Sequence, residues 1–322
     1  MKKIRLIISC IVFFFAIQIH AQEENRYFNH LDLSLEAGST GIGIDIAMPV
    51  GNYLRVRTGA SFMPKIQYSM QFKMQMGENE PVEYDNDGNP YPSRFRRMAD
   101  YLEQFSGYSI KDEYIDVIGE PTFANFKLLI DIQPFKNKNW YFTAGFYAGS
   151  KRIGKAYNTT EEMPTLVAVN MYNSMYERVA NGEAIIDYQG YSLYFPAQFE
   201  DKIYTYGRMG VVLGEYKESG DTYIMEPNSD CMVKANAYVN SIRPYFGCGY
   251  MGAPAKKSPR FKIGFDCGIM FWGGRPDIRM HDGTSLNYEL ENVRGQVGEY
   301  VDIINRFPVF PVLNFKIAYR IF

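Results

Sequence analysis

The sequence predicts an all-β fold, namely an antiparallel up-and-down transmembrane β-barrel of about eight strands, with ten strands as the alternative. In one segment after another, apolar residues recur at every second position, and side chains alternate between two faces along a strand. Aromatic residues make up 16% of the 322 residues, with 26 Tyr and 23 Phe, as suits a protein with long membrane–water boundaries. No segment beyond the N-terminus reaches the roughly 18 apolar residues that indicate a spanning helix.

Each predicted strand has one apolar face with essentially no charge, and the opposite faces taken together mix glycine with Asp, Arg and Lys. In residues 126–132, for example, Phe126 and its neighbours at every second position oppose Lys127 and Asp131. A soluble β-sandwich also alternates, but the near-ten-residue length and aromatic ends such as Trp140 favour the barrel. The eight predicted strands cover residues 31–37, 42–48, 54–62, 126–132, 140–148, 233–239, 261–271 and 313–321.

The connections agree with a bacterial outer-membrane barrel, which has short periplasmic turns and long outer loops. Residues 49–52 and 134–139 form short turns, whereas residues 64–123, 150–232 and 273–311 form long loops. We therefore expect one barrel domain over residues 22–322. The first two strands could be one bent strand, and residues 203–216 could add a hairpin arm. Helical spacing predicts short helices within the long loops, over residues 95–105, 166–179 and 286–304.

The N-terminus has the pattern of a secretory signal peptide. Lys2, Lys3 and Arg5 precede an apolar run over residues 6–17, and Ala21 stands before the expected cleavage point. Residues 1–21 are therefore predicted to direct export. The remaining cysteines, Cys231, Cys248 and Cys267, are odd in number, which argues against a disulfide framework and leaves a single bridge open.

The last third of the chain carries a resemblance to a known family. Residues 243–250 and 264–276 read as a pair of strands, and a Pro-led final strand ends in Tyr319-Arg320-Ile321-Phe322. This part, roughly residues 240–322, resembles the small outer-membrane barrels typified by the ornithine-uptake, carbapenem-associated channel family. Residues 41–57 are similar to barrels common in Bacteroidota. The resemblance implies an outer-membrane location and passage of small solutes, and it implies no catalytic residues.

The polar faces of the predicted strands bring acids and bases together inside the barrel. The interior of an eight-stranded barrel is just wide enough for side chains to fill it. The set can therefore form a salt-bridged plug, and the alternative is a narrow polar path for a small charged solute. The predicted lumen charge network consists of Asp32, Glu36, Asp45, Arg55, Arg57, Lys127, Asp131, Lys234, Lys262, Asp266, Lys316 and Arg320.

Signals for enzymatic, metal or nucleic-acid chemistry are weak. Beyond residue 21 the only histidines are His30, predicted at the periplasmic rim, and His281, predicted in an outer loop. His281 and Ser285 share a turn-like stretch without triad geometry. Residues 85–89 suggest calcium, but Arg96 stands where such a loop needs glutamate. With 34 basic against 36 acidic residues, nothing favours nucleic acid. We expect no catalytic, cofactor-binding or metal-binding residues.

The leading functional hypothesis is a non-enzymatic outer-membrane barrel of a Gram-negative bacterium with a surface structural or binding role and limited passage of small charged solutes. A selective porin-like channel and a soluble exported β-sandwich adhesin are the alternatives, and lipid hydrolysis through His281 is a remote one. The expected partners are outer-membrane lipid and lipopolysaccharide, and the barrel assembly machinery through the C-terminal strand. The sequence names no ligand.

Overall fold

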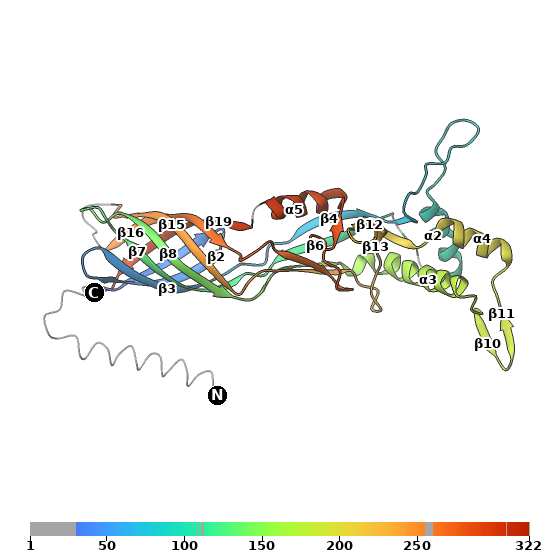
Figure 1. Ribbon diagram of the computed structural model, residues 1–322, viewed down its shortest axis with the longest axis horizontal. Coiled ribbons are helices and arrows are strands. Elements are labelled where there is room, and N and C mark those ends of the chain that lie inside the picture. The colour runs from blue at the N-terminus through green and yellow to red at the C-terminus, as the bar shows by residue number, and fades with distance from the viewer. Residues whose placement is uncertain (1–29, 108, 111–112, 255–259, 307, 322) are drawn as a thin grey trace.

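Eight antiparallel strands close into a barrel, and each pairs with the barrel strand that follows it in the chain (Figure 1). The computed structural model describes residues 30–107, 109–110, 113–254, 260–306 and 308–321. The predicted signal peptide and Phe322 lie outside these residues. The barrel strands are β1 (Asp32–Gly38), β2 (Gly41–Val50), β3 (Leu54–Phe62), β7 (Ala124–Ile132), β8 (Trp140–Gly149), β15 (Ile242–Gly252), β16 (Phe261–Phe271) and β19 (Val309–Arg320).

The barrel is apolar outside and polar inside. In β7, Phe126, Leu128 and Ile130 are exposed, whereas Lys127 and Asp131 are fully buried. The same alternation around the wall produces a continuous exposed apolar surface, as a bilayer requires. The predicted eight-stranded transmembrane barrel is thereby confirmed. None of the helices in the described part of the chain is both long and apolar enough to cross a bilayer.

The assignment of residues 233–239 as the sixth barrel strand was wrong. Residues 233–239 lie outside the barrel, largely in β14 (Lys234–Tyr238), and the barrel strand is β15, which begins at Ile242. Residues 233–239 alternate because they belong to another sheet with one buried face. The ten-strand alternative was also wrong, because residues 209–216 form β12 in a separate sheet.

The long loops are not independent loops but fold together into a second unit. We call the described residues within 63–123, 150–241 and 272–308 the head, which extends from one end of the barrel (Figure 1). Five of its strands form one sheet in the order β17-β14-β9-β6-β4. Besides β14, these are β4 (Tyr68–Lys73), β6 (Tyr114–Pro121), β9 (Arg152–Asn158) and β17 (Asp277–Met280).

This head sheet prolongs the barrel wall. Each of its strands precedes or follows a barrel strand after a break of a few residues, so that β4 continues β3 and β9 continues β8. The head order β17-β14-β9-β6-β4 therefore repeats the barrel order β16-β15-β8-β7-β3. Five barrel strands leave the membrane region as one sheet, and this sheet holds the head on the barrel through backbone as well as side-chain contacts.

A second wall of the head faces this sheet. It contains β12 (Met209–Tyr216), β13 (Thr222–Met225) and β18 (Leu290–Glu291), with β5 (Gln75–Met76) paired to β12. A 3₁₀ turn (Thr160–Glu162) precedes the longest helix. The helices are α2 (Arg94–Ser106), α3 (Met163–Ala180), α4 (Ala197–Tyr206) and α5 (Gly295–Arg306), and a hairpin of β10 (Ile186–Tyr188) and β11 (Tyr191–Leu193) projects beyond them (Figure 1). Buried residues from all three head segments share one hydrophobic core, among them Phe95, Leu166, Tyr172, Met209 and Val301.

Two of the three predicted loop helices occur where expected. The Ser93 side chain caps α2 by accepting a hydrogen bond from the Arg96 amide at 3.0 Å. The Arg96 guanidinium and the Ile110 amide both donate to Glu103, which holds the pKa of that carboxyl below its usual range. The third prediction was too long, since Leu290 lies in a strand and α5 begins only at Gly295.

Cys248 and Cys267 lie directly opposite each other on β15 and β16, with their Sγ atoms 3.5 Å apart and both thiols free. Strands paired in this way keep Cα atoms within the span of a disulfide. We therefore expect copper–phenanthroline and oxygen to join them, which intact mass would report as the loss of two hydrogens. The Cys231→Ser variant should still lose them, whereas Cys248→Ser should not. Persistence of both free thiols under oxidant would contradict this geometry.

Candidate functional site

The middle of the barrel is filled by an ionic cluster. Its members stand on β1, β2, β3, β7, β16 and β19, and each is at most 5% exposed. Four carboxylates face four bases, so that the cluster is balanced in charge. This central charge cluster consists of Glu36, Asp45, Asp131, Asp266, Arg55, Arg57, Lys127 and Lys316.

Each buried base in the cluster touches at least one carboxylate. Lys316 contacts Asp266 and lies 3.1 Å from Asp45 and 3.4 Å from Glu36. Lys127 contacts Glu36 and lies 2.7 Å from Asp45. Because Asp45 and Glu36 serve both lysines, the four groups form one closed ring of ion pairs. Burial of charge is tolerated only with such complete pairing.

The two arginines extend this ring across the lumen. Arg57 donates to Asp266 at 2.6 Å and to Asp131 at 3.2 Å. Arg55 donates to Asp131 through Nε at 2.8 Å, and its second nitrogen lies 2.7 Å from the same carboxylate. The Arg55 guanidinium also lies 4.6 Å from the centre of the Tyr141 ring. The network therefore ties opposite sides of the barrel wall together.

Inward-facing glycines make room for these side chains. Gly59 pairs with Asp45 on β2 and Gly264 pairs with Lys316 on β19. A Cβ added at Gly59 would collide with the Asp45 carboxylate and the Ile44 carbonyl, and one at Gly264 would collide with the Tyr250 carbonyl. The mixture of glycine and charge on the polar faces is thus a packing requirement of a narrow lumen.

Uncharged partners complete the interior, and the sequence prediction did not include them. Tyr141 donates to Asp266 at 2.5 Å and Thr143 donates to Asp131 at 2.7 Å. Tyr147 and Tyr245 meet edge to face, with ring centroids 5.4 Å apart. Tyr141, Thr143 and Tyr147 stand on β8 in phase with the charged residues of β7, so the alternation of β8 contains the signal for these three. Tyr245 stands on β15. Together these groups occlude the lumen.

The remaining predicted site residues lie elsewhere. At the end remote from the head, Asp32 lies 3.4 Å from Lys262 and 3.5 Å from Arg320, and His30 lies 3.5 Å from Asp32. This rim cluster is partly exposed. The assignment of Lys234 to the lumen was wrong, because Lys234 stands exposed on β14 in the head sheet.

Arg243 forms a group of buried hydrogen bonds at the head end of the lumen. It was not among the predicted lumen residues, because residues 243–250 were read as a strand only in the family resemblance and not counted among the eight. Its side chain is 1% exposed and donates to Asn125 at 2.6 Å and to the Asn240 carbonyl at 2.8 Å. A third donation reaches the Ser150 carbonyl. Arg243 thus joins three segments at the point where the barrel wall passes into the head.

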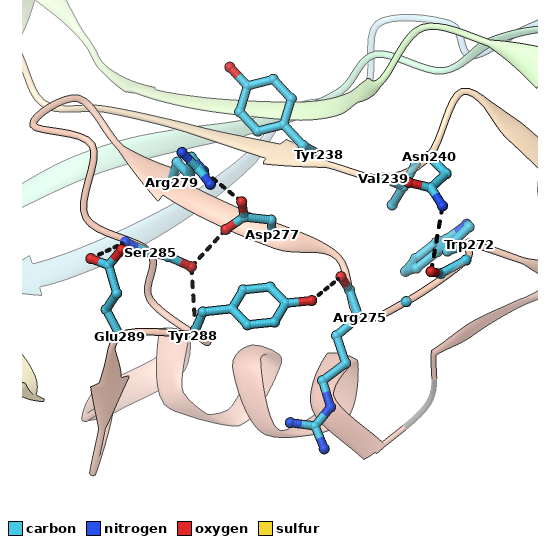
Figure 2. Close-up of a pocket in the computed structure, with 12 residues that line it drawn as sticks. Tyr238, Val239, Asn240, Trp272, Arg275, Asp277, Arg279, Ser285, Tyr288 and Glu289 are labelled. Atoms are coloured by element: carbon cyan, nitrogen blue, oxygen red, sulfur yellow. Dashed lines mark hydrogen bonds and ion pairs between the residues drawn. The ribbon is translucent and has the colours of Figure 1, made fainter. Parts of the chain in front are cut away.

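A polar pocket of about 450 Å³ lies at the same boundary (Figure 2). Polar groups in its lining are hydrogen-bonded to one another. Asp277 accepts a hydrogen bond from Arg279 and another from Ser285, each at 2.6 Å. The Ser285 hydroxyl thus donates to Asp277. Ser285 and His281 lie on the same stretch of the chain.

The stretch that suggested calcium forms a turn, in which Asp85 accepts hydrogen bonds from the Asp87 and Asn89 amides. Among the described residues, no group of three His, Cys, Asp or Glu side chains is placed to hold a metal ion.

Fold and interior together define the class of protein: a transmembrane β-barrel whose lumen is occluded by ion pairs and whose wall continues into a folded head. No family model matches the chain. No curated protein matches it either.

Three solved structures show distant similarity to this chain. CarO2 of Acinetobacter baumannii is 12% identical with a TM-score of 0.38, covering 91% of this chain and 99% of its own. CarO of the same organism is 13% identical with a TM-score of 0.39, covering 92% and 99%. A major outer membrane protein of Thermus thermophilus is 12% identical with a TM-score of 0.24, covering 90% and 98%. At such identities, function has to be argued from this chain's own side chains.

Proposed function

We propose that this chain is a non-enzymatic outer-membrane protein of a Gram-negative bacterium, exported by residues 1–21, whose barrel anchors a folded head at the cell surface for a structural or binding role. The observation that carries the proposal is the contrast between the two units. The barrel is apolar outside and filled with paired charges inside, whereas the head has its own core. A filled barrel suits an anchor better than a conduit.

The direction of the head follows from the rule for bacterial barrels. Turns such as residues 51–53 and 133–139 at the end remote from the head are short, and the head is built from the long connections. Long connections face the outside of the cell in such barrels. β19 ends at the remote, periplasmic side (Figure 1). We assign outer-membrane lipid and lipopolysaccharide to the apolar wall, and the barrel assembly machinery to β19 as its partner during insertion.

The test is ion conductance of the purified full chain in planar bilayers. We expect no steady channel openings, because Arg57, Lys127 and Lys316 are held by carboxylates from across the lumen. An open general porin in the same bilayer serves as the positive control. Steady openings that respond to the charge of the permeating ion would overturn the anchor and favour the selective channel for small charged solutes. The family resemblance of residues 240–322 would then extend to solute passage.

A further inference from the structure

An apolar cavity of about 760 Å³ lies inside the head, between the head sheet and the wall formed by β12, β13 and α5. This volume falls within the roughly 300–1,000 Å³ of small-molecule sites, which are mostly apolar with a few polar groups. The apolar lining has that character, and comes from both walls. It includes Met70, Val117 and Ile278 from the head sheet and Leu213, Met225 and Val297 from the facing wall.

The cavity exists because one face of the head sheet carries small residues. Gly119 on β6 pairs with Ala156 on β9, which pairs with Ala235 on β14. Two residues along each strand, on the same face, Gly154 on β9 pairs with Ala237 on β14. All five line the cavity. Two neighbouring rows of the sheet are thus left without the larger apolar side chains that fill a packed sandwich.

The backbone does not require glycine at these positions. A Cβ added at Gly154 would meet the Ala237 Cβ at 3.7 Å, and one at Gly119 would meet the Met70 Cε at 3.4 Å, which are ordinary contacts. Neither glycine has a positive φ. The barrel glycines differ, since a Cβ at Gly264 would collide with backbone. The small residues of the head sheet therefore leave space rather than permit close packing.

The opening of the cavity is lined by aromatic rings. Tyr68 and Tyr300 line it and are 62% and 56% exposed. The Lys155 side chain faces away from the cavity, because Lys155 pairs with Glu120 and Asn236, one residue along the strand from the cavity-lining residues Gly154 and Ala156. An elongated apolar molecule can occupy the interior while its polar end reaches water beside the two tyrosines.

We propose that this cavity binds the hydrocarbon chain of a single-chain amphiphile. Its lining is mostly apolar, and apolar surface that faces water is unfavourable. An acyl chain removes this cost by covering the lining, and its polar end lies at the opening beside Tyr68 and Tyr300. The inference gives a ligand class to the binding role proposed above and in this respect rests on it.

The experiment uses the full chain in phosphatidylcholine vesicles with palmitic acid that carries a diazirine near its chain end. After illumination, peptide mass spectrometry locates the adducts. We expect adducts on β9 and β14 in the head, competed by excess unlabelled palmitate, and uncompeted adducts on the lipid-facing barrel wall. Ala235→Phe should lower the head adducts at least tenfold. Lys234→Phe, on the exposed face one residue away, should leave them unchanged.

A second filling variant guards against misfolding of the first. Gly154→Val adds a side chain where a Cβ fits, so resistance of the head to limited proteolysis should be kept while head adducts fall. Absence of head adducts in the unmodified protein, or adducts undiminished in both folded filling variants, would overturn the proposal. Head adducts without barrel adducts would instead contradict the membrane-embedded barrel and leave the cavity assignment standing.

Discussion

Asp266→Ala is expected to lower the free energy of unfolding by about 3–5 kcal/mol, because removing one partner of a buried ion pair leaves the other charges uncompensated. Asp266 accepts from Arg57 at 2.6 Å and from Tyr141 at 2.5 Å, and it contacts Lys316. Its loss leaves three carboxylates for four buried bases. The measurement is the urea midpoint of unfolding, together with the temperature at which the unheated barrel loses its distinct mobility on SDS gels.

Lys262→Ala is the matched control for this prediction. Lys262 also forms an ion pair, with Asp32 at 3.4 Å, but it lies at the partly exposed rim where Arg320 remains beside Asp32. The Lys262 side chain is 22% exposed, and Asp32 keeps Arg320 and His30 beside it after the substitution, so this variant should lose far less stability than Asp266→Ala. Equal effects of the two substitutions would show that the central charge cluster does not hold the barrel together.

Phe315→Arg is expected to cost about 2–4 kcal/mol, since a cation on the lipid face near the bilayer midplane loses its hydration. Phe315 stands in the middle of β19 and is 64% exposed on the apolar wall, next to the fully internal Lys316. The same strand thus accepts a charge at one position and excludes it at the next. Refolding into phosphatidylcholine vesicles during a urea titration measures the difference.

Tyr319→Arg provides the depth control for Phe315→Arg. Tyr319 faces outward on the same strand but lies near its end, where a cation reaches the lipid headgroups. The expected cost there is about 0–1 kcal/mol. If the two variants were destabilised equally, the apolar wall of the barrel would not be the surface that faces lipid.

The barrel was predictable because one physical rule governs all eight strands. A wall between lipid and a filled lumen imposes strict alternation, and residues 126–132 show it without interruption. Residues 243–250 were read as a strand only in the family resemblance and not counted among the eight, because Tyr245 and Met251 place uncharged side chains on the inner face of β15 and weaken its alternation. Residues 233–239 alternate more cleanly, because one face of the head sheet is buried as well. Alternation identifies strands but does not say to which sheet they belong.

Helical periodicity predicted two helices of the head, but its five-stranded sheet could not be read from periodicity, because the paired strands lie far apart in the chain. Lys234 on β14, for example, pairs with Tyr157 on β9. Of the predicted lumen residues, eight on correctly placed strands form the central charge cluster, and Asp32, Lys262 and Arg320 lie at the rim remote from the head. Lys234 lies outside the barrel because its strand belongs to the head sheet. Arg243 was missed because β15, the strand that carries it, was not among the eight predicted strands. The pairing of each lumen charge depends on barrel closure, which local sequence does not encode.

The continuation of five barrel strands into the head has a consequence for the order of assembly. The head sheet draws its strands from three separate excursions of the chain, and the excursions join where β6 pairs with β9 and where β14 pairs with β17. These pairs form only when all three excursions are on the same side of the membrane. The hydrophobic core, shared by all three, cannot form earlier. The barrel strands that flank the excursions must therefore be in place before the head matures, and pairings of such high contact order make this last step slow. We expect a newly inserted molecule to pass through a stage in which its barrel strands are in place and its head is still open to proteases.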